Sequence, residues 1–334
     1  MPDWSPLHAR IHRLIQTQKF ASGMLPRGAK LLVAVSGGQD SLCLLKLLVD
    51  LRDKWGWSLL VVHCDHRWRP DSAENADFVK RLTEQWQVPY EGAIADPIPR
   101  SEAAARQWRY QVFESFALSQ GYSHVVTGHT ATDRAETLLY NLIRGSGADG
   151  LGALTWMRSH SPTAPQIQLV RPLLAVTRTE TERFCEEFQI PIWQDSTNSD
   201  RTYARNRLRL DVMPYLQTHF NPSCDRTLAQ TAEILAAEVD LLDHLASDLY
   251  DQAVMPPNSD QPWRIQRGLL KTAHQALQRR VMRRVLQTAG SAQVTFDAVE
   301  KLVALIDAPN RSQSDPFSGG AIARVENDWI FLEV

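Results

Sequence analysis

Short apolar runs alternate with longer amphipathic stretches between about residues 30 and 195. The runs predict strands, and the stretches have the spacing of helices. The expected strands are Leu31–Val35, Leu59–Cys64, Glu91–Ala95, His124–Thr127 and Gln168–Pro172, and the clearest helices are Ala73–Trp86, Ser101–Ser119 and Asp133–Ile143. This alternation predicts an α/β fold, a doubly wound, mostly parallel sheet with helices on both faces. Because ligands in such sheets bind beyond the carboxyl ends of the strands, we expect the loops after Val35, Cys64 and Thr127 to form one site.

The pattern changes after about residue 220, where helical spacing predominates. Helices are expected at Thr227–Leu249, Gly268–Thr288 and Thr295–Ile306, with breaker-rich segments at Met255–Pro262 and Pro309–Gly320 and a short strand pair around Asn327 and Asp328. We therefore predict two domains. Residues 1–218 form the α/β domain, with a core at about 28–215, and residues 219–334 form a mainly helical domain that ends in the strand pair.

The composition is that of an ordinary water-soluble protein, with 334 residues, 43% hydrophobic content and a formal net charge of −2. No apolar run approaches the roughly 20 residues of a membrane span, and the N-terminus lacks a signal-peptide pattern. We therefore expect a cytoplasmic protein without a membrane partner. The cysteines make neither a Cys-x-x-Cys pair nor a disulfide framework, which favours reduced structural thiols at Cys43, Cys64, Cys185 and Cys224.

The most specific feature follows the first expected strand: Ser36-Gly37-Gly38-Gln39-Asp40-Ser41, leading into an apolar helix. Backbone N–H groups in a glycine-rich turn at a helix N-terminus can hold an anion. Gly37 and Gly38 lack the Cβ atoms that would keep phosphate oxygens away. Ser36 and Ser41 add hydroxyls, and Asp40 is a candidate Mg²⁺ ligand. An ordinary N-cap at Asp40 or Ser41 is the alternative, but the whole context favours phosphate binding.

This loop differs from two common phosphate-binding motifs. A Walker A loop needs a lysine for the β- and γ-phosphates, and no lysine stands between Lys30 and Lys46. The Gly-x-Gly-x-x-Gly fingerprint of dinucleotide sites is also absent. The six residues instead resemble the PP-loop of the N-type ATP pyrophosphatases. That resemblance implies cleavage of ATP to AMP and pyrophosphate, with adenylation of a carbonyl oxygen and displacement of AMP by a nucleophile.

The loop after the second expected strand is rich in histidine and arginine. His63 and His66 could join a metal site, but only one carboxylate lies nearby and no third strong ligand is in view. A basic loop that places His66, Arg67 and Arg69 against phosphates or RNA is better supported, and a solvated loop is the plain alternative.

The helix expected at Ser101–Ser119 carries Arg106 and Arg109 at helical spacing, with Glu102 four residues before Arg106. Simple helix salt bridges explain much of this pattern. The two arginines and Tyr110 could equally line an anionic groove.

Two carboxylates begin the helix that follows the strand His124–Thr127. Asp133 and Glu136 are three residues apart, so both project from one helix face. They could simply favour the helix dipole; beside a phosphate loop, they could bind Mg²⁺ or the ammonium group of an amine substrate. His129, at the strand end, could contact phosphate or transfer a proton, or it could be a core histidine bonded to backbone.

Basic residues are concentrated in two later segments. The first contains Arg201, Arg205, Arg207 and Arg209 with Tyr203 between them, which suits phosphate neutralisation and base stacking. The second, residues 261–296, has no acidic residue and carries Arg264, Arg267, Lys271, Arg279, Arg280, Arg283 and Arg284. A solvated helix face is the common explanation of such a run, and contact with an RNA backbone is the interpretation we favour.

Together these motifs resemble the tRNA(Ile)-lysidine synthetase family of PP-loop enzymes, in the family's order across about residues 30–215. The matching positions are Ser36–Ser41, Asp65-His66 with Arg69, Ala104-Ala105-Arg106 with Arg109-Tyr110, Gly128-His129 with Asp133 and Glu136-Thr137, Arg144–Gly147, Arg171–Leu174, Asp195 with Asn198, and Arg205-Asn206 with Arg209. Phe317–Gly320 and the last strands resemble the end of the family's helical tRNA-contacting domain. The resemblance implies a short form without the further C-terminal domain of longer members. Thr130 and Thr132 stand where many relatives have histidine and aspartate, so no role is transferred to them.

The resemblance implies ATP-dependent ligation of free L-lysine to the wobble cytidine of the CAU-anticodon isoleucine tRNA, which changes codon specificity from AUG to AUA. ATP would bind at Ser36–Ser41 with Mg²⁺ on Asp40. The other implied roles are catalysis by Asp40, His129, Asp133, Glu136 and Arg205, lysine binding by Asp133, Glu136 and Arg109, and tRNA binding by Arg69, Arg106, Arg207, Arg209, Arg279, Arg280, Arg283 and Arg284. The oligomeric state stays open, with a homodimer as one option.

Two other functions are compatible with parts of the pattern. A PP-loop tRNA thiolase generally needs a cysteine pair or an iron–sulfur cluster, and the four scattered cysteines disfavour it. A non-catalytic RNA-binding relative would keep a vestigial nucleotide loop, and the intact Ser36–Ser41, Asp133 and Glu136 count against that.

Overall fold

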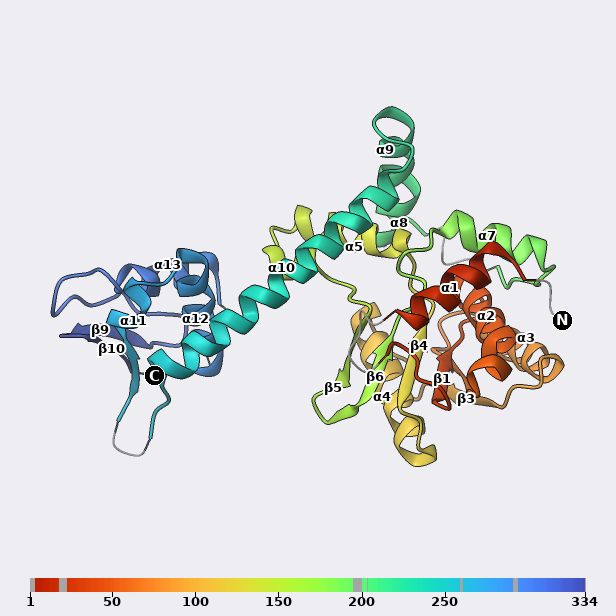
Figure 1. The fold of residues 1–334 in the computed structure, drawn as a ribbon, viewed down its shortest axis with the longest axis horizontal. Helices are drawn as coiled ribbons and strands as arrows, with labels where there is room; N and C mark the ends of the chain where they lie inside the picture. The colour runs from red at the N-terminus through yellow and green to blue at the C-terminus, as the bar shows by residue number, and fades with distance from the viewer. Residues whose placement is uncertain are drawn as a thin grey trace. The chain divides into compact units, whose positions relative to one another are not determined.

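The computed structural model describes residues 4–17, 23–194, 200–202, 204–258, 261–290 and 294–333. The chain divides into two compact units, Met1–Ala236 and Ala237–Val334, which we call unit 1 and unit 2 (Figure 1). The division falls inside the long helix α10 (Cys224–Ala253). The boundary expected after residue 218 precedes this helix and stays a prediction.

The described residues of unit 1 form a six-stranded sheet with the strand order β3-β2-β1-β4-β6-β5. The parallel strands are β1 (Lys30–Ala34), β2 (Ser58–Asp65), β3 (Tyr90–Ile94), β4 (His124–Thr127) and β6 (Ala164–Val170). The edge strand β5 (Met157–Ser161) pairs antiparallel with β6. The expected mostly parallel sheet is confirmed. The expectation missed β5 and began β6 four residues late, because Arg158, Ser159 and Gln166 give these two segments a polar pattern.

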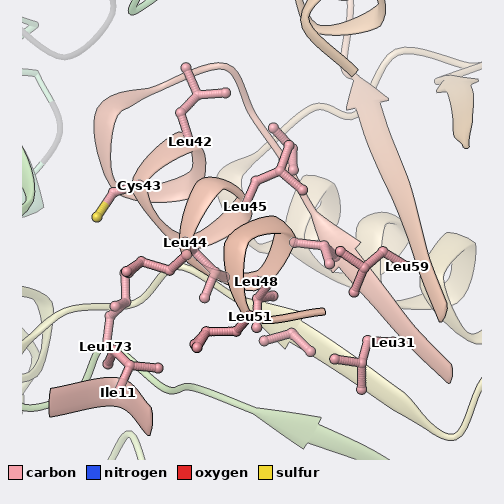
Figure 2. Close-up of a cluster of buried hydrophobic side chains, with 14 of the residues drawn as sticks. Ile11, Leu31, Leu42, Cys43, Leu44, Leu45, Leu48, Leu51, Leu59 and Leu173 are labelled. Carbon is pink, nitrogen blue, oxygen red and sulfur yellow. The ribbon is translucent and has the colours of Figure 1, made fainter. Parts of the chain in front are cut away.

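Alternating side chains of β1 serve the cores on both faces of the sheet. Leu31 and Val33 belong to the core shared with α1 (Pro6–Gln16), α2 (Gln39–Trp55), α3 (Ser72–Gln85) and α7 (Arg178–Glu187). Leu32 faces the opposite core, which includes Phe113 of α4 (Glu102–Gln120). Residues on nearly every side of α2 are buried, as expected for a helix that is apolar all round. Figure 2 shows its leucines, with Leu31 and Leu59 from the strands and Ile11 from α1 in the same cluster. Burial of each such leucine stabilises the fold by about 1.5–3 kcal/mol.

The strand order reverses between β1 and β4, so this pair is the switch point of the doubly wound sheet. The loops that follow these two strands lie against one another. A Cβ atom added to Gly128, just after β4, would lie 2.9 Å from the carbonyl oxygen of Asp40 in the first turn of α2. Only glycine permits this close approach, because it has no Cβ atom. The loop after β4 therefore lies directly against the loop after β1.

Unit 1 continues with α5 (Ala131–Ile143), α6 (Ala148–Leu151) and a helical segment of three consecutive elements. These are α8 (Ala204–Arg207), the π-helical turn η2 (Leu208–Val212) and α9 (Met213–His219). Met213 packs with Ala135 of α5 and Cys224 of α10 in a small separate core. The helix predicted at Asp133–Ile143 corresponds to α5, which begins two residues earlier, at Ala131.

Unit 2 contains the end of α10, α11 (Arg267–Lys271), α12 (Gln275–Thr288) and α13 (Phe296–Ala304). Its described strands form an antiparallel sheet in the order β7-β8-β10-β9, with β7 at Val254–Met255, β8 at Trp263–Gln266, β9 at Ile322–Glu326 and β10 at Trp329–Glu333. The predicted terminal strand pair is present. The expected helix Gly268–Thr288 is interrupted at Thr272–His274, and the strands β7 and β8 were not predicted. Within the described ranges, no helix is both long enough and apolar enough to cross a membrane.

Candidate functional site

The turn between β1 and α2 is closed by its own hydroxyl groups. The backbone N–H of Ser36 donates to Ser41 Oγ at 3.2 Å, and Ser41 Oγ donates to the carbonyl of Gly38 at 2.8 Å. Helix α2 begins after Gly38, and no side chain caps it. The positive end of the helix dipole is thus left without a side-chain acceptor, as in sites where an anion takes that place.

Gly37 is needed for a reason other than the one expected from the sequence. Its φ is +86°, a conformation that favours glycine, and an added Cβ would lie 2.4 Å from Asn75 Oδ1 of α3. A Cβ on Gly38 would meet Ser36 Oγ at an ordinary 3.5 Å. Gly37 therefore allows the turn to pack against α3, rather than only leaving space for phosphate oxygens.

Helix α7 forms hydrogen bonds with Gln39 and Asp40 of the phosphate loop, and the sequence did not reveal these contacts. Thr181 Oγ1 donates to Asp40 Oδ1, and Gln39 Nε2 donates to both Thr181 Oγ1 and the carbonyl of Arg178. Arg178 Nη1 lies 3.8 Å from Asp40 Oδ2. Burial raises the pKa of Asp40 to about 6, and the charge of Asp133 adds to this shift, against the opposing effects of Arg178 and Thr181.

Asp133 and Glu136 of α5 form a buried ion network with Arg205 of α8 and Arg209 of η2. Asp133 Oδ1 accepts from Arg205 Nη2 at 2.9 Å and from Arg209 Nη2 at 3.1 Å. Glu136 accepts from Arg205 Nε at 3.2 Å and, through two bonds, from Arg209 at 2.7 and 2.9 Å. The other oxygen of Asp133 accepts from the backbone N–H and hydroxyl of Thr130 in a capping box. The predicted shared face of the two carboxylates is confirmed. Arg209, expected to bind tRNA, contacts these carboxylates in this structure.

The network sets the charge state of its neighbours. Burial acts to raise the pKa of Asp133, but Arg205, His129 and Arg209 hold it below its usual value. Burial lowers the pKa of His129 to about 3, and His129 Nδ1 shares a hydrogen bond of 2.9 Å with Thr127 Oγ1. A neutral imidazole at this position can form hydrogen bonds but does not carry the proton of an imidazolium near pH 7.

The residues around the loop fit a nucleotide. Asn75 Oδ1 and Trp193 Nε1 are buried polar atoms without a hydrogen-bond partner, and both side chains lie next to Gly37. Such atoms are expected where a ligand completes the site. Among the described residues no group of three or more His, Cys, Asp or Glu side chains is arranged to hold a metal. A single carboxylate such as Asp40 still suits Mg²⁺, which binds mainly to phosphate oxygens and water.

The loop after β2 and helix α4 lie beside one another. His66 is 5.2 Å, ring to ring, from Trp108 of α4, and burial followed by the charge of Arg109 lowers the pKa of His66 to about 4. Arg69 Nε lies 3.5 Å from Asp71 Oδ1, and the guanidinium of Arg106 lies 5.5 Å from the ring centre of Tyr110. The structure thus brings His66 and Arg109 together, while Arg106 is exposed.

The remaining predicted arginines have protein partners. Arg207 is exposed and donates to the carbonyls of Arg201 and Thr202. In unit 2, Arg279 pairs with Glu300, Arg280 with Asp243, and the guanidinium of Arg284 lies 4.2 Å from the ring centre of Tyr250. Arg283 also has an interaction partner. Arg267, part of the basic run, is buried and donates to the carbonyls of Ile306, Asn327 and Ala308, so its role is structural.

Asp195, Ser196, Thr197, Asn198 and Tyr203 lie outside the described residues. The residues that sequence reasoning missed are Arg178 and Thr181 on α7, together with Asn75 on α3. Their signal was weak, because one threonine, one asparagine and one arginine on amphipathic helices match no motif.

The fold and the loop at the switch point define a PP-loop protein, and the PP-loop domain family matches residues 7–216. The tRNA(Ile)-lysidine synthase of Nostoc sp. is 54% identical over 98% of this chain and 97% of its own length. That of Synechococcus sp. is 48% identical over 99% of this chain and 97% of its own. A solved structure, the U34-tRNA thiolase NcsA from Methanococcus maripaludis with its [4Fe-4S] cluster, covers 69% of this chain and 77% of its own with a TM-score of 0.56 and 14% identity, which shows the fold alone.

The chain belongs to the tRNA(Ile)-lysidine synthase family. The family resemblance inferred from the motifs is therefore confirmed over nearly the full length of the chain, including unit 2.

Proposed function

We propose that this chain is the ligase that joins free L-lysine to the wobble cytidine of the CAU-anticodon isoleucine tRNA, with ATP as the energy source. One observation carries the proposal in a chain of this family. The phosphate loop and the paired carboxylates of α5 occupy the same edge of the sheet: Arg178 lies 3.8 Å from Asp40 through its guanidinium group and donates its backbone N–H to Thr132, the residue before Asp133. A phosphate site beside a carboxylate site is what joining an amine to an adenylated base requires.

The reaction proceeds in two balanced steps. The base carbonyl oxygen of the cytidine attacks the α-phosphorus of ATP and forms an oxygen–phosphorus bond. The bond from the α-phosphorus to the oxygen that bridges to the β-phosphorus breaks, and pyrophosphate leaves with that oxygen and its electron pair. The neutral ε-amine of lysine then attacks the adenylated carbon, and AMP leaves with the oxygen. The amine loses one proton in this step, and a nearby carboxylate or His129 could accept it. Because His129 has a pKa near 3, it accepts a proton only weakly near pH 7.

In this proposal the residues at Ser36–Ser41 bind the phosphates of ATP. The uncapped N-terminus of α2 supplies N–H donors and a positive dipole end. Asp40 holds Mg²⁺, which screens the phosphate charge when bound. Thr181 and Arg178 orient the carboxylate of Asp40.

Asp133 and Glu136 bind the ammonium groups of lysine in this proposal. In the structure both carboxylates are already paired with Arg205 and Arg209. A lysine ammonium group that enters therefore replaces a guanidinium group, and the released arginine becomes available to a phosphate of ATP or RNA. Arg205, the more exposed of the two, is the one we expect to move. Arg109 remains a candidate for contact with lysine or RNA.

The test is to incubate the protein with ATP, Mg²⁺, labelled lysine and a transcript of the isoleucine tRNA. We expect label in the tRNA only when ATP and lysine are both present, with one pyrophosphate and one AMP released per lysine. A transcript with uridine at the wobble position is the matched control and should take up no label. Dependence on a sulfur donor, or tRNA binding without turnover, would contradict the proposal. A cytoplasmic location follows from the expected tRNA substrate.

A further inference from the structure

The outward side of α9 carries aromatic side chains where a surface helix usually carries charged ones. Tyr215 is 57% exposed and Phe220, at the end of the helix, is 73% exposed. The ring centres of Tyr215 and Phe220 are 6.1 Å apart, and the exposed His219 lies 4.5 Å from Tyr215. We call Tyr215, His219 and Phe220 the aromatic face. Contiguous exposed apolar groups of this kind mark interaction sites.

Other residues of the same helix are fixed in the protein. Met213 is buried, and Leu216 packs with it against Ala135 and Cys224. Since these contacts already fix α9 to unit 1, the aromatic face is not needed to hold the helix in place. Figure 1 shows α9 projecting away from the sheet of unit 1 and the helices that cover it.

We infer that the aromatic face stacks against an unpaired base of the RNA substrate, next to the base that reacts. This inference rests on the proposed function, since that function supplies the RNA. Tyrosine, phenylalanine and histidine offer flat π-surfaces, and unpaired bases stack on such surfaces whatever their sequence. No acidic residue occurs between Met213 and Cys224 to repel a phosphate backbone.

The position of the aromatic face along the helix supports this assignment. Arg205 and Arg209, in the ion network, and the exposed Arg207 precede it in the same continuous helical segment. With a rise of about 1.5 Å per residue, Tyr215 lies about 9 Å along the axis from Arg209. An RNA strand that brings its target base to the ion network would therefore bring a nearby base to the aromatic face.

The test compares Y215A, F220A and the double variant with L118A. Leu118 is also exposed, at 51%, but it lies near the end of α4, just before β4 begins at the opposite sheet edge. We expect each aromatic truncation to weaken tRNA binding about five-fold or more, and the double variant to weaken it further. The variant F220W keeps an aromatic ring and should bind tRNA as the unmodified protein does. The dependence of binding on salt should keep its slope, because stacking releases no counterions. L118A should bind tRNA as the unmodified protein does.

Direct evidence would come from transcripts with 2-aminopurine at single positions of the anticodon loop, whose fluorescence falls when the base stacks. We expect quenching at one position with the unmodified protein and its loss in Y215A/F220A, while ATP-analogue binding and the unfolding temperature are unchanged. Unchanged tRNA affinity and quenching in Y215A/F220A would overturn the inference, even if lysine incorporation by the unmodified protein supports the proposed function. A change in oligomeric state without a change in tRNA binding would also overturn it, since the aromatic face would then contact a second copy.

Discussion

Units 1 and 2 each contain an arginine that holds a glutamate through two hydrogen bonds with the same geometry. Arg209 contacts Glu136 at 2.7 and 2.9 Å, and Arg279 contacts Glu300 at 2.7 and 2.9 Å. The side chain of Glu136 is 0% exposed and shares its arginines with Asp133, whereas that of Glu300 is 31% exposed. The two pairs thus differ in burial rather than in geometry, and burial decides what breaking each pair costs.

This difference bears on RNA binding by unit 2. Ion pairs at the surface contribute little to stability, so a phosphate group can replace Glu300 or Asp243 at small cost. The arginines of α12 therefore remain candidates for tRNA contact although they have carboxylate partners. In unit 1, a phosphate group that drew an arginine away from Asp133 and Glu136 would leave these buried carboxylates without an opposite charge. Another cation must then take the place of the arginine, which is the property expected of a site for an ammonium group.

The largest effect should come from the substitution E136Q. It leaves Arg205 and Arg209 with one carboxylate in a buried setting, and we expect the free energy of unfolding to fall by about 3 kcal/mol. Lysine incorporation should fall at least a hundred-fold, with the loss mainly in lysine affinity. Urea unfolding and incorporation at varied lysine concentration measure the two effects. Normal lysine affinity in E136Q would remove Glu136 from the lysine site.

The next largest effect should come from R280E/R284E in unit 2. Reversing two charges on α12 should weaken tRNA binding about ten-fold or more and flatten its salt dependence, while ATP binding is spared. The substitution D243N tests the same surface in the opposite direction, because removing the carboxylate beside Arg280 raises the positive charge. We expect D243N to bind tRNA slightly more tightly. Equal affinities for all of these variants would separate α12 from tRNA binding.

A smaller effect should appear in the response to acid. Arg205 and Arg209 hold the folded-state pKa of Asp133 below its unfolded value of about 4, despite its burial. The stability that this carboxylate contributes is fully present above the unfolded value and is lost as the pH falls through the folded value. The free energy of unfolding should therefore decline between pH 5 and pH 3, and less steeply in D133N. Parallel curves for D133N and the unmodified protein would contradict this.

The smallest effect is expected for E300Q, the matched control of E136Q. Its arginine partner is exposed enough to be hydrated when the pair is lost, so the unfolding midpoint should remain nearly unchanged. Lysine incorporation should also be unchanged. A loss of stability equal to that of E136Q would show that burial does not distinguish the two pairs.

The parallel sheet, the position of the loop at its switch point and the shared face of the two carboxylates could be predicted because their signals are local. Leu31–Val35 followed by Ser36–Ser41 gives a strand, a turn and a helix start, and Asp133 with Glu136 gives one helix face. The contacts between Thr181 and Asp40 join residues 141 positions apart, and no spacing rule connects them. The pairing of Arg209 with Glu136 is equally non-local, so the sequence suggested an RNA contact instead.

The errors in unit 2 have a similar cause. Trp263–Gln266 is a strand because Trp263 and Ile265 are buried in the core of unit 2, while Arg264 and Gln266 alternate with them. A run of four residues beside a loop is too short to give a clear period. Arg267 was counted with the surface arginines because composition does not show burial, and its three backbone carbonyl partners come from distant segments.

The π-helical turn η2 sets the direction in which the side chains of α9 point relative to those of α8. Each residue of a helix turns its successor by about 100°, and a π-helical turn accommodates an extra residue within the helix. Deleting Val212 would therefore rotate Tyr215 by about a quarter turn relative to Arg205 and Arg209, without removing any side chain that either site uses. The alignment between the carboxylate-bound arginines and the aromatic rings thus depends on chain length at one turn, and an insertion or deletion there could disconnect two otherwise intact surfaces.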